Sequence, residues 1–150
     1  MEILDYFESG RRDWWLEQIG RSGWDAGQLL YALLREDRLK ALCGESTKLL
    51  LLTEGDELLS FCTYAERDDI QPTALRPWMG FVYTFPAYRG RRLLGRLFEA
   101  VEALAREQGF PAVYISTSHV GLYETYGCVF DRILDDIHGE PVRVYRKDVG

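Results

Sequence analysis

The sequence has few cysteines and no hydrophobic run long enough to cross a membrane. Its 150 residues include three cysteines, Cys43, Cys62 and Cys128, which are far apart and form no CxxC pair. This pattern is typical of free thiols in a reducing compartment and speaks against a disulfide framework or a zinc site. The longest apolar stretches, such as 49–52, are far shorter than the ~20 residues of a membrane helix, and the N-terminus lacks a basic segment followed by an apolar run. We therefore expect a cytoplasmic protein that does not associate with membranes.

Positive charge is also scarce. The chain has 18 Lys and Arg residues against 24 Asp and Glu residues, which gives a formal net charge of −6. Proteins that bind nucleic acid usually present a basic face to the phosphates, so this balance argues against a nucleic-acid partner. The length suits one domain, 1–150, with a sizeable hydrophobic core.

The hydrophobic pattern predicts a mixed α/β domain. Residues 11–43 have the spacing of amphipathic helices, with Asp13 as the N-cap of one helix and Ser22-x-x-Asp25 as a capping box for the next. In the core, 47–146, we expect strands at 49–53, 58–64, 78–85, 112–117, 128–133 and 142–146, a long helix at 93–105 and a short helix at 120–126. This order predicts a mixed sheet with helices packed on it and one βαβ crossover.

Arginine is concentrated in one short segment. Four of the fifteen arginines, Arg89, Arg91, Arg92 and Arg96, lie within eight residues at the start of the long helix. A helix N-terminus carries partial positive charge and normally favours acids, yet the first acid after this cluster begins is Glu99. Gly90 would let the backbone approach a ligand closely. The segment therefore indicates a phosphate site at the helix N-terminus, although a solvated arginine face on a surface helix has the same pattern.

Two motifs resemble those of the GNAT superfamily of N-acetyltransferases. The segment 84–94, TFPAYRGRRLL, follows an expected strand and resembles the family motif x-P-x-x-R-G-x-G-x-G/A, which binds the pyrophosphate of acetyl-CoA. About thirty residues further on, 121–127, GLYETYG, is similar to the family signature Y-E-x-x-G-F. The resemblance covers roughly 47–146. It implies the GNAT fold, in which a central, mostly antiparallel sheet carries helices on both faces.

The sequence departs from the family pattern at three positions. Arg92 and Leu94 stand where the family usually has Gly and then Gly or Ala, and the next glycine is Gly95. Cys128 stands where the second motif has Phe, a change with little mechanistic weight. The side chains at 92 and 94 could crowd the pyrophosphate, or Arg92 could replace backbone contacts with a charge-assisted one. We expect these departures to affect how tightly CoA binds.

The resemblance also implies which residues bind the cofactor and protonate the leaving group. In GNAT enzymes, backbone groups of the fourth strand bind the pantetheine arm, which here implies Val82, Tyr83 and Thr84. The residues implied for the pyrophosphate are Arg89, Gly90, Arg91, Arg92, Leu93, Leu94 and Gly95. Tyr123 is implied as the general acid that protonates the CoA thiolate, with Tyr126 as the alternative.

Several residues are candidates for the general base. An amine acceptor has a pKa near ~10 and must lose a proton before it attacks. The glutamate that many family members carry on the fourth strand is absent from 78–85. The candidate bases are Glu66, Asp68 and Asp69 on the loop 65–77, His119 before the short helix, and bulk solvent. His138 lies beside Asp135 and Asp136, but a turn accounts for it better than a metal site, and we expect no metal.

The implied function is transfer of an acetyl group from acetyl-CoA to a primary amine of a small molecule or peptide, by direct attack in a ternary complex. The expected partners are acetyl-CoA and the acceptor, in a monomer or homodimer. A non-catalytic acyl-CoA-binding or regulatory domain is the alternative, because residues 92 and 94 depart from the motif and the strand acid is missing. An RNA-associated basic helix is a weaker one. Trp14, Trp15, Trp24 and the acids of the loop 65–77 are compatible with a cationic small molecule, a peptide N-terminus or a lysine, and we favour a small amine.

Overall fold

A seven-stranded sheet forms the centre of the computed structural model, which describes residues 1–149. Its strands are β1 (Glu2–Asp5), β2 (Lys48–Glu54), β3 (Glu57–Ala65), β4 (Trp78–Thr84), β5 (Ala112–Thr117), β6 (Val129–Asp135) and β7 (Pro141–Asp148), in the order β1-β2-β3-β4-β5-β7-β6. Neighbouring strands are antiparallel, except for the parallel pair β4 and β5. The predicted mixed, mostly antiparallel sheet with a single crossover is confirmed.

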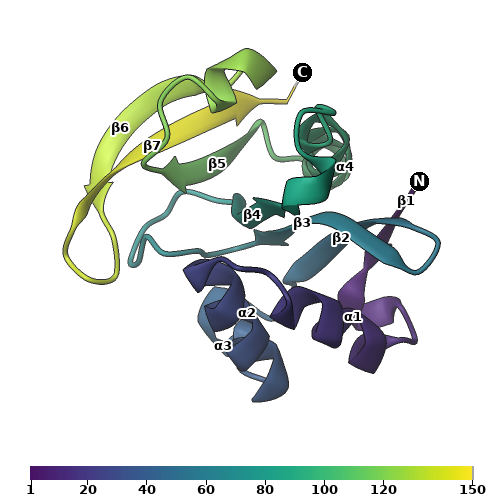
Figure 1. Cartoon of the computed structure of the whole chain (residues 1–150). Helices are drawn as coiled ribbons and strands as arrows, with labels where there is room; N and C mark the ends of the chain where they lie inside the picture. The colour runs from purple at the N-terminus through teal and green to yellow at the C-terminus, as the bar shows by residue number, and fades with distance from the viewer. Residues whose placement is uncertain (150) are drawn as a thin grey trace.

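Helices cover both faces of this sheet, as predicted. The α-helices are α1 (Arg12–Gly20), α2 (Asp25–Arg35), α3 (Leu39–Cys43) and α4 (Leu94–Glu107), and the 3-10 helices are η1 (Tyr6–Glu8), η2 (Pro86–Tyr88) and η3 (Tyr123–Tyr126). Figure 1 shows α4 on one face and the first three helices on the other. Within the described residues, no helix is both long enough and apolar enough to cross a membrane.

The run of leucines in β2 shows how the sequence produces this layering. Leu49 and Leu51 pack into the cluster formed with α1, α2 and α3, whereas Leu50 and Leu52 pack into the cluster formed with α4. Side chains alternate between the two faces of a strand, so a strand covered on both sides must be apolar at every position. The continuous leucine run therefore marks a strand in the middle of the layers.

The N-terminal region differs from the sequence prediction. The first strand, β1, was not predicted, because four residues are too few to show a pattern; it pairs antiparallel with the edge of β2, from Glu2 opposite Thr53 to Asp5 opposite Leu50. The predicted caps were wrong. Helix α1 begins after Arg11 and α2 after Trp24, and neither residue makes a side-chain capping bond.

Packing explains why Ser22 does not cap α2. A Cβ built on Gly27 of that helix would lie 2.1 Å from the Ser22 hydroxyl oxygen, so the helix packs directly onto this side chain. The hydroxyl is buried and has no hydrogen-bond partner among the described residues. Tertiary contact has therefore overridden the local capping signal.

Strand β4 contains an irregularity that separates it from β5. Thr63 of β3 lies opposite Gly80 and Phe61 lies opposite Tyr83, so β4 has one residue more than its partner between these positions. Within this bulge the backbone of Phe81 is left-handed, with φ of 46°. The pairing of β4 with β5 is confined to Trp78 opposite Tyr114. Beyond that pair the two strands diverge, and side chains from both can face a common space.

Candidate active site

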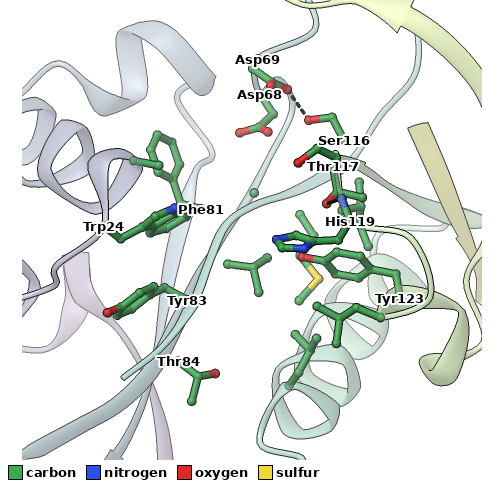
Figure 2. A pocket seen from close by; sticks show the side chains of 18 of the residues that line it. Trp24, Asp68, Asp69, Phe81, Tyr83, Thr84, Ser116, Thr117, His119 and Tyr123 are labelled. Carbon is green, nitrogen blue, oxygen red and sulfur yellow. Dashed lines mark hydrogen bonds between the residues drawn. The ribbon is translucent and has the colours of Figure 1, made fainter. Parts of the chain in front are cut away.

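The space between the diverging strands is a cavity of about 810 Å³. Residues of β4 from Met79 to Thr84 line one wall, and residues from Ile115 to His119 line the other. Figure 2 shows Trp24, Phe81 and Tyr83 on one side, and His119 and Tyr123 facing them from the other. The loop that carries Asp68 and Asp69 closes one end. The cavity thus joins segments that are far apart in the sequence.

The loop between β4 and α4 exposes backbone groups to this cavity. Gly90 and Arg92 both have left-handed backbones, with φ of 83° and 55°. Helix α4 begins after Leu93 without a side-chain cap and has no acid in its first turn. Free N–H groups at a helix start, preceded by alternating left-handed residues, form a concavity that suits an anion. Arg92 stands where the family motif has glycine, and its left-handed backbone is a conformation that favours glycine.

The arginine cluster adds positive charge that no protein acid neutralises. Arg89 donates from its Nε to the carbonyl oxygen of Thr84 at 2.9 Å, and its guanidinium lies over the Tyr83 ring. The guanidinium of Arg92 lies over the Tyr126 ring, 5.3 Å from the ring centroid. In residues 1–149, neither forms a salt bridge with an acid. The site is therefore prepared for a ligand that carries negative charge.

Most of the predicted cofactor-binding residues meet in this cavity. Those that line it are Val82, Tyr83, Thr84, Arg89, Gly90, Arg92, Leu93 and Leu94. Arg91 and Gly95 are not among the lining residues. The guanidinium of Arg91 lies over the ring of Tyr88, and Gly95 faces Tyr126, where an added Cβ would lie 3.5 Å from a ring carbon. The helix itself begins at Leu94, so three of the four clustered arginines belong to the preceding loop.

Tyr123 extends its phenol into the cavity from η3 (Figure 2). Its ring is buried and packs edge-on against Phe98 of α4, with the centroids 6.2 Å apart. Burial raises the pKa of the phenol well above its ordinary value, so it keeps its proton at neutral pH and can donate it. Tyr126 also lines the cavity, but its ring is stacked on Phe98 and covered by Arg92. Of the two candidates, Tyr123 is the more deeply buried.

The structure separates the candidate acids. Asp68 and Asp69 line the cavity, whereas Glu66 is not brought to it and accepts a hydrogen bond from Ser46 at 2.9 Å. Asp69 accepts a hydrogen bond from the hydroxyl of Ser116. Burial, strengthened by the neighbouring charge of Asp69, raises the pKa of Asp68 to about 7. Asp68 therefore titrates in the range where a general base is useful.

Both histidines reach the cavity. His119 is exposed and lies near Tyr123 (Figure 2), and its backbone N–H donates to Thr117 Oγ1 at 3.0 Å. His138 lies in the turn between β6 and β7, and its backbone N–H donates to the Asp136 carboxylate at 2.8 Å. Among the described residues, no group of three or more His, Cys, Asp or Glu side chains could hold a metal ion.

Two contacts that shape the cavity were not predicted from the sequence. Trp24 was expected near the acceptor only as one of several aromatics; in the structure its ring stacks face to face on Tyr83, with centroids 5.2 Å apart and planes 8° apart. Gly80 lies in β4, where a Cβ would fall 2.2 Å from Oδ1 of Asp68. No local signal could have identified either contact, because each joins residues distant in the chain.

A sheet opened beside a bulged strand, with an arginine-rich loop leading into a helix at the opening, is the arrangement expected from the two sequence motifs. The family model described as the acetyltransferase (GNAT) family matches residues 10–127. The chain therefore belongs to the GNAT acetyltransferase family. A search of the curated proteins found no match to this sequence.

Solved structures share the fold. The aminoglycoside 6'-N-acetyltransferase from Enterococcus faecium is 14% identical, with a TM-score of 0.66 over 100% of this chain and 98% of that one. An aminoglycoside 6'-N-acetyltransferase complexed with coenzyme A is 13% identical, with a TM-score of 0.68 over 100% and 98% of the two chains. An acetyltransferase of the GNAT family from Staphylococcus aureus is 13% identical, with a TM-score of 0.65 over 99% of each chain. At these identities the likeness establishes the fold alone.

Proposed function

We propose that the protein transfers an acetyl group from acetyl-CoA to a primary amine of a small molecule or peptide, by direct attack in a ternary complex. The observation that carries this proposal is the single cavity shared by the loop at Gly90 and Arg92, the bulge of β4 and the hydroxyl of Tyr123. These are respectively a site for phosphates, a set of backbone groups for the acyl chain, and a proton donor.

The acyl donor is supported by charge and by backbone conformation. The left-handed residues Gly90 and Arg92 precede the uncapped start of α4, and the clustered arginines have no acidic partners in the described part of the chain. A pyrophosphate would satisfy both the free N–H groups and the positive charge. One protein of the same fold is described as complexed with coenzyme A, which agrees with this assignment.

In the proposed reaction, residues of this chain stabilise charge and move protons. Backbone N–H groups freed by the bulge around Phe81 would stabilise the negative charge that develops on the thioester oxygen. Tyr123 would donate its proton to the departing sulfur. A base must accept a proton from the incoming ammonium group, and Asp68, Asp69 and His119 are the candidates that reach the cavity. No acyl-enzyme intermediate is required.

The acceptor side of the cavity combines aromatic and acidic groups. Trp24 and Phe81 form an apolar wall, and Asp68 and Asp69 lie at one end (Figure 2). Aromatic faces and carboxylates both attract a cation. This supports a small cationic amine as the acceptor, and three solved structures of the same fold are described as aminoglycoside acetyltransferases.

Thermal unfolding with and without acetyl-CoA, followed by an acetylation assay, tests the proposal. Acetyl-CoA should raise the melting temperature in a concentration-dependent way, because a ligand that binds the folded state stabilises it. Wild-type protein should then release free CoA thiol when primary amines are added. Binding of acetyl-CoA without turnover across a broad panel of amines would favour a non-catalytic binding domain instead. Retention on heparin that persists in saturating CoA would favour the RNA-associated reading of the arginine cluster.

A further inference from the structure

The Asp68 carboxylate lies where a side chain at position 80 of β4 would otherwise be. A Cβ built on Gly80 would lie 2.2 Å from Oδ1 and 2.8 Å from Oδ2 of Asp68, far inside normal contact distance. The carboxylate therefore rests directly on the strand backbone, where a side chain at position 80 would otherwise extend. Gly80 is also the last regularly paired residue before the bulge, opposite Thr63. A carboxylate delivered by a loop thus lies at the point where β4 leaves β5.

The loop that carries this carboxylate is fixed at several points. Before Asp68, the backbone N–H of Arg67 donates to the Cys43 carbonyl at 2.9 Å. After it, the Gln71 amide donates to the Asp68 carbonyl at 2.8 Å. The carbonyl of Asp69 accepts from the Ile137 N–H at 2.7 Å, and its side chain accepts from Ser116. Contacts with α3, β5 and the β6–β7 turn therefore hold the carboxylate in place.

We infer that the carboxylate of Asp68 accepts the proton of the attacking amine, in the space that Gly80 leaves free on β4. This inference rests on the proposed acetyl transfer and assigns its base. His119 is less suited, because it is exposed and lies on the side of Tyr123, whereas Asp68 is half-buried at the amine end. Within residues 1–149, no cation forms a salt bridge with Asp68 that would keep its affinity for a proton low.

The proton balance is complete with the residues present. Asp68 takes one proton from the ammonium group, and the freed lone pair forms the C–N bond at the thioester carbon. As the C–S bond breaks, its electron pair leaves with sulfur, which takes the phenolic proton of Tyr123. A second nitrogen proton restores the phenol, and the proton on Asp68 passes to solvent. One proton is released for each acetyl group transferred, as the overall reaction requires.

The proposed test measures kcat against pH for wild type and Asp68→Asn, with an amine that the wild type acetylates. Burial and the charge of Asp69 raise the pKa of Asp68 to about 7, so wild-type kcat should fall as the pH is lowered through about 7. The other titratable groups near this carboxylate are Asp69 on the same loop, Cys43 of α3, Tyr123 of η3, and His119 and His138 at the cavity. Asp68→Asn keeps the shape of the side chain and should lower kcat about 100-fold, without the fall near pH 7.

Two further variants separate the base from its surroundings. Glu66→Gln removes another acid of the same loop. The Glu66 side chain accepts a hydrogen bond from Ser46 and does not line the cavity, so this variant should have the kcat of the wild type. The double variant Asp68→Gly with Gly80→Glu places a carboxylate on β4, in the space that the Asp68 side chain has left. Its kcat should be about tenfold higher than that of Asp68→Gly alone.

The outcomes distinguish this inference from the proposed function. If the wild type acetylates amines and Asp68→Asn retains both the kcat and its pH dependence, Asp68 is not the base and the acetyltransferase activity stands. If the wild type binds acetyl-CoA but acetylates no amine, the proposed function fails, and the assignment of Asp68 fails with it. Binding of acetyl-CoA, followed by thermal shift, reports whether each variant is folded.

Discussion

The guanidinium of Arg92 lies 5.3 Å from the centroid of the Tyr126 ring, and that ring stacks on Phe98 of α4. The contact places a cation at the mouth of the cavity while its backbone holds a left-handed conformation, with φ of 55°. A non-glycine residue pays about 1 kcal/mol or more for that conformation. The chain thus keeps a glycine-like loop shape and adds a positive charge to it.

Replacing Arg92 with glycine should separate these two contributions. Arg92→Gly relieves the left-handed strain and loses a cation–π contact of about 0.5–1 kcal/mol, so the melting temperature should change little. The loss of a charged donor to phosphate should weaken acetyl-CoA binding about tenfold. Calorimetric titration measures the dissociation constants of acetyl-CoA for the wild type and for Arg92→Gly. Arg106→Ala is the control, because Arg106 lies in the last turn of α4 and does not line the cavity. Equal affinities for wild type and Arg92→Gly would contradict the assigned role.

Tyr123→Phe should lower kcat about 100-fold or more, because it removes the proton donor and keeps the ring that packs on Phe98. The KM for acetyl-CoA should change little, and the melting temperature should stay close to that of the wild type. Release of CoA thiol at saturating substrates is the measurement. Tyr126→Phe is the matched control on the same 3-10 helix; a larger loss in this variant than in Tyr123→Phe would reverse the assignment of the general acid.

The carboxyl of Asp68 should destabilise the fold above neutral pH. Its pKa in the folded protein is about 7, whereas an unfolded aspartate titrates near ~3.9. The folded state therefore binds more protons between these values, and stability falls as the pH rises from about 4 to about 7. Asp68→Asn should remove this loss and increase the free energy of unfolding at pH 8 by about 2 kcal/mol after allowance for screening by solvent.

Chemical denaturation of both proteins at pH 4 and pH 8 measures this effect. The gain from Asp68→Asn should be largest at pH 8 and should disappear toward pH 4. A higher free energy of unfolding together with a lower activity is the trade-off expected when a catalytic group destabilises the folded protein. A variant that is less stable than the wild type at pH 8 would show that the carboxylate stabilises the fold.

Trp24 should affect the acceptor and leave the acyl donor unaffected. Its ring stacks on Tyr83 at the wall opposite Tyr123, so Trp24→Ala removes part of the proposed amine site. The KM for the amine should rise about tenfold, since a buried aromatic contact is worth about 0.5–1.5 kcal/mol beyond its area. Trp14→Ala is the control, because Trp14 lies in α1 outside the cavity and donates to the Asp56 carbonyl at 3.0 Å. An equal rise in the KM for acetyl-CoA would count against this division of the cavity.

The local patterns in the sequence determined much of the fold. The central strands and the long helix were predictable because side-chain periodicity follows from backbone geometry. The features that predicted them were the leucine run of β2, the apolar face of α4 and the glycines that end the helices. The arginine cluster also drew attention to the loop at Gly90, which lines the cavity in the structure, because charge that no nearby acid balances is visible in the sequence. The four-residue β1 and the cap of α2 were not predictable in this way. They depend on an open sheet edge and on the packing of Ser22 against Gly27.

Only the tertiary structure decided which acids and aromatics share the cavity. Glu66 and Asp68 are two residues apart on the same polar loop, yet one bonds Ser46 and the other rests on Gly80. Trp24 meets Tyr83 because α2 packs on the sheet where β4 bulges. Periodicity and charge describe a residue's own element, whereas these contacts depend on how distant elements are placed against one another. The sequence thus predicted the loop where we propose that phosphates bind, and the divergence of β4 from β5 determined which side chains face it.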